Sequence, residues 1–241
     1  MLKKFHFYRF EFKYIIPEKY KEFIKEDLLR FMKPDDYASF KKNKKYIVNS
    51  LYYDNSNLKS YQDKIDGLKK RFKLRLRVYS AYNYIENKEI FFEIKRKNDA
   101  VVIKDRGLFS KQICRHFLQN KENNILNSKG IKKRDILKDF LWLKQKHSML
   151  PKIKVLYERE PFEGIYHHNL RITFDSNIYG FRLDNFLNEI NPHLLLKNNF
   201  VMEVKFRGVL PYWFHQLIQR YQLQKTSFSK YCRAVELCYN C

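Results

Sequence analysis

The stretch Arg71-Phe72-Lys73-Leu74-Arg75-Leu76-Arg77-Val78-Tyr79 decides how the rest of the sequence is interpreted. Cationic and apolar residues alternate without a break from position 71 to position 78. A period of two is typical of a β-strand, whose successive side chains point to opposite faces of a sheet. We therefore expect a strand with four positive charges on one face and apolar side chains on the other. For a single isolated strand, a solvated basic surface would be the simplest interpretation.

The same alternation of ionic and apolar residues recurs along the chain, which argues against that simple interpretation. The clearest repeats are at residues 8–16, 89–97 and 202–207. Further strands are expected at residues 46–54, 101–106, 154–159 and 170–175. Apolar residues at helical spacing also predict four amphipathic helices. These helices are expected at residues 17–33, 109–118, 131–146 and 211–223.

The expected helices can cover the apolar faces of the strands, so that the charged faces point inward. Closing such a sheet makes a barrel whose interior is lined by Arg, Lys and a few Glu side chains. No stretch rich in Pro, Gly or Ser divides the chain, so a single domain over residues 1–241 is expected. The predicted fold class is α+β, a closed β-barrel flanked by α-helices.

The charge of the whole chain points to an anionic ligand. The 241 residues include 49 Lys and Arg against 26 Asp and Glu, a formal net charge of +23. An excess of this size destabilises a compact state unless a polyanion is usually bound. The candidates are nucleic acid, anionic lipid and polyphosphorylated small molecules.

Three features of the sequence predict a cytoplasmic protein. No run of about 18 apolar residues, the length that a membrane-spanning helix needs, is present. The chain begins without the apolar core of a signal peptide. Its four cysteines do not have the spacing of a disulfide framework.

An interior lined by cations suits a chain of phosphates. Burying unpaired cations is costly, whereas arginine forms forked hydrogen bonds to phosphate oxygens and lysine supplies a point charge. The lysines on charged faces that we expect to contact phosphate include Lys73, Lys97, Lys104 and Lys205. The pattern leaves open whether the few carboxylates there pair with cations or hold a divalent metal that bridges phosphate oxygens. These carboxylates are Glu11, Glu93 and Glu203.

Seven short motifs, each weak alone, occur together in a recognisable order. They are Arg9-x-Glu11-x-Lys13-Tyr14, Arg71-x-Lys73-x-Arg75-x-Arg77-x-Tyr79, Phe92-Glu93-Ile94-Lys95, Tyr157-x-Arg159, Arg171-x-Thr173-x-Asp175, Met202-Glu203-x-Lys205 and Ser229-Lys230-Tyr231. Over nearly the whole chain, they resemble the VTC domain, the polyphosphate polymerase domain of the triphosphate tunnel metalloenzyme superfamily. The resemblance implies an antiparallel eight-stranded tunnel that binds ATP and polyphosphate with Mn²⁺ or Mg²⁺. It also implies transfer of the terminal phosphoryl group of ATP to a growing polyphosphate.

The resemblance assigns roles to residues at the matching positions. It implies that the catalytic cations are Arg75, Arg77, Lys95, Arg159, Arg171 and Lys230. It implies further phosphate contacts from Lys13, Tyr157 and Ser229, and a metal carboxylate at Glu203. One departure is Ser227, at a position where the family often has a basic residue. We expect neither the regulatory nor the membrane domain of the eukaryotic complexes, so that a membrane role would need a separate partner.

Three other functions remain open from the residues. A tunnel triphosphatase would need a water molecule oriented by a group such as Glu11 or Glu93, whereas a phosphate acceptor is already anionic and needs no general base. A non-catalytic polyphosphate-binding module would keep the cations without turnover. An RNA-binding protein is disfavoured, because the aromatic residues fall largely opposite the cations and are poorly placed for base stacking.

Overall fold

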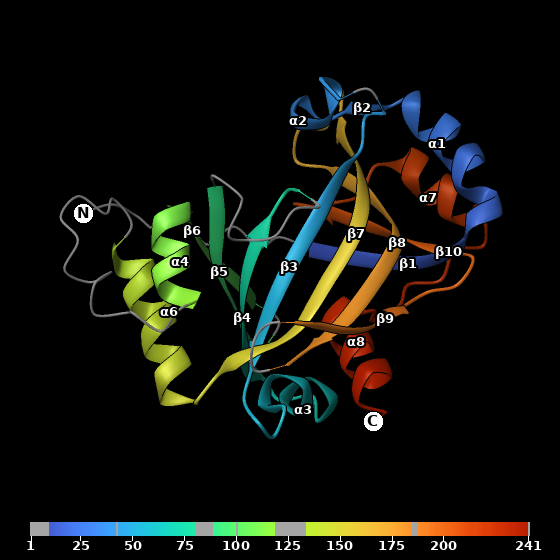
Figure 1. The fold of residues 1–241 in the computed structure, drawn as a ribbon. Helices are drawn as coiled ribbons and strands as arrows, with labels where there is room; N and C mark the ends of the chain where they lie inside the picture. Colours follow the sequence, from blue (N-terminus) through green and yellow to red (C-terminus); the bar gives the residue numbers. More distant parts are fainter. Residues whose placement is uncertain are drawn as a thin grey trace. The chain divides into compact units, whose positions relative to one another are not determined.

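The chain forms an antiparallel sheet with flanking helices, an α+β fold. The computed structural model describes residues 10–41, 43–80, 89–99, 101–118, 134–184 and 188–240, with no side-chain description at residue 134 (Figure 1). Contacts divide these residues into two compact units. Unit 1 is made of the described parts of Met1–Tyr46, Tyr157–Ile178 and Leu196–Ser229. Unit 2 is made of the described parts of Ile47–Leu156, Tyr179–Leu195 and Lys230–Cys241.

Eight strands form one continuous path of paired neighbours. In spatial order they are β1 (Phe10–Pro17), β10 (Asn199–Phe206), β8 (Arg171–Leu183), β7 (Leu150–Gly164), β3 (Tyr46–Asp54), β4 (Lys70–Val78), β5 (Glu89–Asn98) and β6 (Val101–Ser110). Two short strands lie off this path, β2 (Met32–Pro34) on β7 and β9 (Glu189–Leu194) on β8. The antiparallel pairing agrees with the sequence prediction, whereas the sheet has ten strands and not the eight that the resemblance implies.

Closure of the sheet, by contrast, is not found. Among the described residues, the path of paired strands begins at β1 and ends at β6 without a pairing that joins the two. A closed barrel needs every strand to have two neighbours, and each of these two strands has one on the path. The closed-barrel part of the predicted fold is therefore not confirmed.

The core of unit 2 lies between one face of its strands and two helices. The alternate apolar residues of β4 and β5 pack under α4 (Lys111–Leu118) and α6 (Arg134–Lys146), which lie together beside these strands in Figure 1. The ring of Phe92 lies 4.9 Å from that of Phe117 and 5.2 Å from that of Phe140, all fully buried. Arg96 interrupts the apolar face near the strand end, where it pairs with Asp105 and Asp139. The prediction that helices cover the apolar faces is confirmed here.

Unit 1 repeats this arrangement with different helices. The apolar sides of β1, β8 and β10 pack against α1 (Lys21–Leu29) and α7 (Tyr212–Arg220). Ile24 and Leu28 of α1 and Phe214 of α7 are fully buried there, with Phe174 and Phe200 from the strands. The opposite faces of the same strands are left for the charged side chains.

Several short elements complete the fold. They are η1 (Glu18–Tyr20), α2 (Asp36–Ser39), α3 (Lys59–Ile65) and α8 (Lys230–Tyr239). The Asp54 carboxylate, at the end of β3, accepts hydrogen bonds from the amides of Ser60 and Tyr61 and from the Tyr231 hydroxyl. One buried side chain therefore ties β3, α3 and α8 together. No helix among the described residues has both the length and the apolar character needed to cross a bilayer.

Candidate functional site

Cations gather on the face of β4, β5 and β6 that lies opposite the unit 2 core. The strand register places Arg75 beside Glu93 and Glu93 beside Arg106, while Lys73, Lys95 and Lys104 form the next row. Side chains directly opposite on neighbouring strands share a face. We call this set the cationic face, and it consists of Arg71, Lys73, Arg75, Arg77, Lys95, Lys97, Lys104 and Arg106.

Glu93 is the carboxylate at the centre of the cationic face. Its Oε2 lies 2.5 Å from Arg75 Nε and 4.0 Å from Arg77 Nε, and its Oε1 lies 2.6 Å from Lys104 Nζ and 3.1 Å from Arg106 Nε. The side chain is fully buried. Burial alone would raise the pKa of Glu93, but the charges of Arg75, Arg77 and Lys104 outweigh it and hold the pKa well below its ordinary value. Glu93 is thus an ionised counter-charge with cations at both oxygens.

Positive charge remains in excess around Glu93. Burial and then the nearby Arg75 charge lower the pKa of Lys104 to about 7, although Glu93 opposes the shift. Burial would raise the pKa of the Tyr52 hydroxyl, yet Arg75 and Arg77 together lower it to about 8. The Tyr52 shift, which positive charge causes against the effect of burial, indicates that cations exceed anions at this site; the Lys104 shift is mainly an effect of burial, with Arg75 adding to it.

The first turn of α8 packs against the edge of the cationic face within unit 2. Lys73 Nζ lies 3.3 Å from Cys232 Sγ and 4.5 Å from the centre of the Tyr231 ring. Lys230, the first residue of α8, is buried. The helix therefore contacts the Lys73 ammonium through two side chains, those of Tyr231 and Cys232.

Unit 1 carries a second charged cluster, centred on Glu203 of β10. The register places Glu203 beside Lys13 of β1 on one side and Thr173 of β8 on the other. Lys205 Nζ lies 3.0 Å from Glu203 Oε2, and Lys13 Nζ lies 3.7 Å from Glu203 Oε1. Lys13 also lies 3.2 Å from Glu11 Oε1 and donates to the Phe228 carbonyl at 2.8 Å.

Arg159 joins two carboxylates in this unit 1 cluster. Its Nε and Nη2 donate to the two oxygens of Asp175, each at 2.7 Å, and Nη2 also lies 3.2 Å from Glu203 Oε2. Burial opposes the charge of Arg159, but Asp175, Tyr157 and Glu203 raise its pKa well above the ordinary value. Burial is also the main reason why the pKa of Lys205 is lowered. Unlike the cationic face, this cluster has carboxylates in number similar to its cations.

The remaining residues expected in the site differ in exposure. Tyr157 is buried, with its ring centre 5.3 Å from the Arg159 guanidinium. Arg171 begins β8 and pairs with Asp35 at 2.8 Å, with its side chain 46% exposed. Ser229 is half-buried. The structure brings most of the expected cations into two clusters, one in each unit, while their assigned roles stay predictions.

The family profile for the VTC domain matches residues 8–239. The chain belongs to the VTC domain family. A comparison with curated proteins gives no match.

Two solved structures have a distant likeness to this VTC domain. A Bacillus halodurans protein provisionally described as an adenylate cyclase has 13% identity and a TM-score of 0.49, with 91% of this chain and 92% of that chain covered. A Pyrococcus horikoshii protein has 12% identity and a TM-score of 0.45, covering 95% and 98% of the two chains. Likenesses this distant identify no activity.

The carboxylates of the VTC domain differ in how well they suit a metal ion. Within the residues that the structure describes, no three His, Cys, Asp or Glu side chains form a ready-made metal site. Mg²⁺ is commonly held by one or two carboxylates together with substrate phosphates, so such a group is not required. Glu203, with Glu11 linked to it through Lys13, comes nearer to this pattern, because its side chain keeps 8% exposure, although Lys13, Arg159 and Lys205 all pair with it. Glu93 does not, because four cations surround its fully buried oxygens.

Some residues in or beside these clusters had no site role predicted from the sequence; they include Arg71, Arg106, Asp175 and Tyr52. Arg106 ends the expected strand 101–106 and continues the alternation from Lys104, so this signal was present. Asp175 lies in a quoted motif, but only the structure shows that it holds Arg159 with both oxygens. Tyr52 accepts a hydrogen bond from Arg75 Nη1 at 3.0 Å, a contact with no signal in the local sequence.

Proposed function

We propose that this chain is a metal-dependent polyphosphate polymerase, which transfers the terminal phosphoryl group of ATP to a polyphosphate chain. The observation that carries the proposal is the cationic face, where three neighbouring strands present eight cations around one carboxylate. An extended anion can contact several of these cations at once, and each new contact relieves repulsion between them. Membership of the VTC domain family supports a triphosphate or polyphosphate ligand.

The proposed roles follow the two clusters. In unit 2, Arg75, Arg77 and Lys95 bind phosphate oxygens, and Lys73, Lys97, Lys104 and Lys230 extend this binding. In unit 1, Arg159, Arg171, Lys13 and Lys205 bind phosphate, together with Tyr157 and Ser229. The eight-stranded tunnel that the resemblance implies is part of the same proposal, because a closed sheet would shield the phosphate chain from water.

The chemistry requires positioning and charge stabilisation more than acid–base catalysis. An anionic terminal oxygen of the polyphosphate attacks the γ-phosphorus of ATP, the bond from that phosphorus to the β–γ bridging oxygen breaks, and ADP leaves. Arginine forks suit the equatorial oxygens of the transferring group. Mn²⁺ or Mg²⁺, held by Glu203 with Glu11, would neutralise charge on the phosphate oxygens. Asp175 keeps Arg159 oriented through its two hydrogen bonds.

The test is to analyse the products formed from ATP. Purified protein is incubated with ATP and Mn²⁺, and samples over time are run on a gel stained for polyphosphate, with ADP and orthophosphate measured in parallel. The proposal predicts a ladder of lengthening chains with ADP formed in proportion. Orthophosphate without chains would identify a triphosphatase, and tripolyphosphate binding without turnover would identify a binding module; either would overturn the proposal.

A further inference from the structure

Two loops of unit 1 expose a group of large apolar side chains. The β7–β8 loop carries Tyr166, which is 77% exposed, and the segment after β10 carries Val209, which is 89% exposed. Tyr212, the first residue of α7, is 75% exposed. Single exposed apolar residues are ordinary, but a group of them marks a binding surface. None of these residues belongs to the clusters assigned to phosphate binding.

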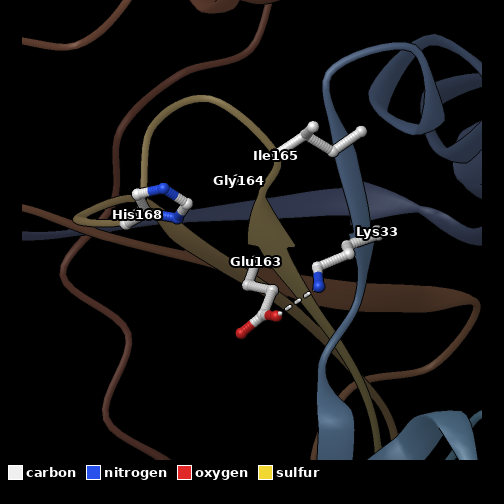
Figure 2. A pocket seen from close by; sticks show the side chains of 5 residues that line it. All are labelled: Lys33, Glu163, Gly164, Ile165 and His168. Atoms are coloured by element: carbon white, nitrogen blue, oxygen red, sulfur yellow. Dashed lines mark ion pairs between the residues drawn. The ribbon is translucent and has the colours of Figure 1, made fainter.

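The two loops are neighbours in space. Tyr166 and His167 of the first loop line one hollow of about 270 Å³ together with Arg207 and Val209 of the second. His168 lines this hollow and also an adjoining one of about 260 Å³ (Figure 2). Figure 2 shows Lys33 turned toward Glu163 in the second hollow, at 3.3 Å, with Ile165 nearby. Two further exposed residues lie close in the chain: Arg30 precedes Phe31, whose carbonyl accepts a hydrogen bond from the Ile165 amide at 3.0 Å, and Tyr212 follows Pro211 of the first hollow. We call these two residues and the exposed residues that line the hollows the loop surface: Arg30, Lys33, Ile165, Tyr166, Arg207, Val209 and Tyr212.

Local structure holds the loop surface in place. The amide of Gly164 donates to the Leu170 carbonyl at 3.1 Å, and a Cβ at Gly164 would lie 2.4 Å from the His167 carbonyl oxygen, so the tight loop requires glycine. Gly208 has a φ of +74°, a conformation that glycine adopts without strain and that turns the chain before Val209. The exposure of Tyr166 and Val209 is thus built into the backbone.

The charge of the loop surface is positive. Arg30 and Lys33 have side chains 71% and 56% exposed, and Arg207 is also exposed. Glu163 is the carboxylate lining the hollows, and it is paired with Lys33. In contrast, the exposed aromatic Phe23 on α1 has the exposed acidic residues Glu22 and Glu26 as close sequence neighbours.

We propose that the loop surface binds the interface of a bilayer containing anionic lipid. Tyrosine favours the interfacial layer of a membrane, where its ring is apolar and its hydroxyl remains hydrated. Arginine and lysine beside it are attracted by the negative potential of anionic lipids. Tyrosine, valine and cations mixed on and beside two adjoining loops combine the two attractions that hold a peripheral protein on an anionic bilayer, apolar insertion and charge. The chain would then reach a membrane surface without a membrane-spanning partner.

The test is co-sedimentation of the full chain with vesicles of phosphatidylcholine, with and without phosphatidylserine. Saturating tripolyphosphate is present throughout, so that the cationic face cannot bind lipid headgroups. The double variant Val209→Ser/Tyr212→Ser should bind phosphatidylserine vesicles at least about tenfold more weakly than wild type. Arg207→Ser should weaken binding to these vesicles and leave the weak binding to pure phosphatidylcholine unchanged. Phe23→Ser is the matched control and should bind as wild type does.

Each outcome decides the proposal. The melting temperature and the tripolyphosphate affinity of the double variant are measured alongside. If both equal those of wild type, any loss of vesicle binding is a local effect of the two substitutions. Equal binding by the double variant and wild type would overturn the proposal. Failure of wild type to bind phosphatidylserine vesicles would also overturn it. If wild type instead forms dimers that the double variant abolishes, the loop surface binds a second copy of the chain and not a membrane. Polyphosphate synthesis in solution is expected to be unchanged in the double variant, which separates this test from that of the proposed function.

Discussion

Replacing Glu93 by glutamine should destabilise the protein strongly in the absence of a polyanion. Glutamine keeps the size of the side chain but leaves Arg75, Arg77, Lys104 and Arg106 without their shared counter-charge. Removing one partner of a buried ion pair typically costs about 3–5 kcal/mol. At roughly 2–4 °C per kcal/mol for a chain of this size, the melting temperature should fall by roughly 6–20 °C.

Tripolyphosphate should reverse much of this loss. The ligand binds only the folded state, and without Glu93 it meets four uncompensated cations, so it should stabilise Glu93→Gln more than it stabilises wild type. Acid should also narrow the difference between the two proteins. Because the folded-state pKa of Glu93 is lowered, its contribution to stability is present above the unfolded-state pKa and is lost as the pH falls toward the folded-state value.

The assay is thermal unfolding of both proteins with and without tripolyphosphate at constant ionic strength. Glu163→Gln is the control, because its partially exposed carboxylate pairs with one surface lysine, an interaction usually worth about 0–1 kcal/mol. A change in the melting temperature of Glu93→Gln no larger than that of the control would refute the reasoning. Loss of metal dependence at an unchanged melting temperature would instead show that Glu93 is a metal ligand.

Three further predictions concern the ligand, the metal and protons. Tripolyphosphate should raise the melting temperature of wild type far more than sulfate at matched ionic strength, with an effect that shrinks as salt is added; equal stabilisation by both anions would rule out an extended phosphate site. Glu203→Gln should raise the Mn²⁺ concentration needed for turnover while metal-free ATP binding persists, and a variant that only melts earlier would assign Glu203 a structural role. Binding of tripolyphosphate near pH 7 should be accompanied by proton uptake, because the bound anion raises the lowered pKa of Lys104. Calorimetry in buffers of different ionisation enthalpy should show this proton uptake, and the uptake should be smaller in Lys104→Met.

The local structure of the strands was largely predictable from the sequence. The bounds of β3, β4 and β5 agree with the expected strands to within one residue at each end, because alternation is a property of neighbouring residues. The helix expected at residues 17–33 ends at Leu29, since Met32–Pro34 pairs with β7 instead. β9 has no apolar alternation and forms through pairing with β8, a long-range contact.

The candidate site was predictable as a set of residues, but not as a set of contacts. Alternation places Arg75 and Glu93 on charged faces, yet only the register of β4, β5 and β6 shows that Glu93 meets four cations. Whether Glu93 is a metal ligand or a counter-charge therefore depends on neighbours that are distant in the sequence. The same holds for Asp175, whose role follows from the position of Arg159 on another strand.

The central claim is that the cationic face holds the phosphate chain during synthesis. The most direct measurement compares polyphosphate formation from ATP and Mn²⁺ by Arg77→Met and Arg96→Met. Arg77 lies on the cationic face, whereas Arg96 lies on the opposite face of β5 and pairs with Asp105 and Asp139. The account predicts that wild type and Arg96→Met form lengthening chains and that Arg77→Met, while still folded, loses at least about tenfold in rate. Chain formation by Arg77→Met at the wild-type rate would contradict it.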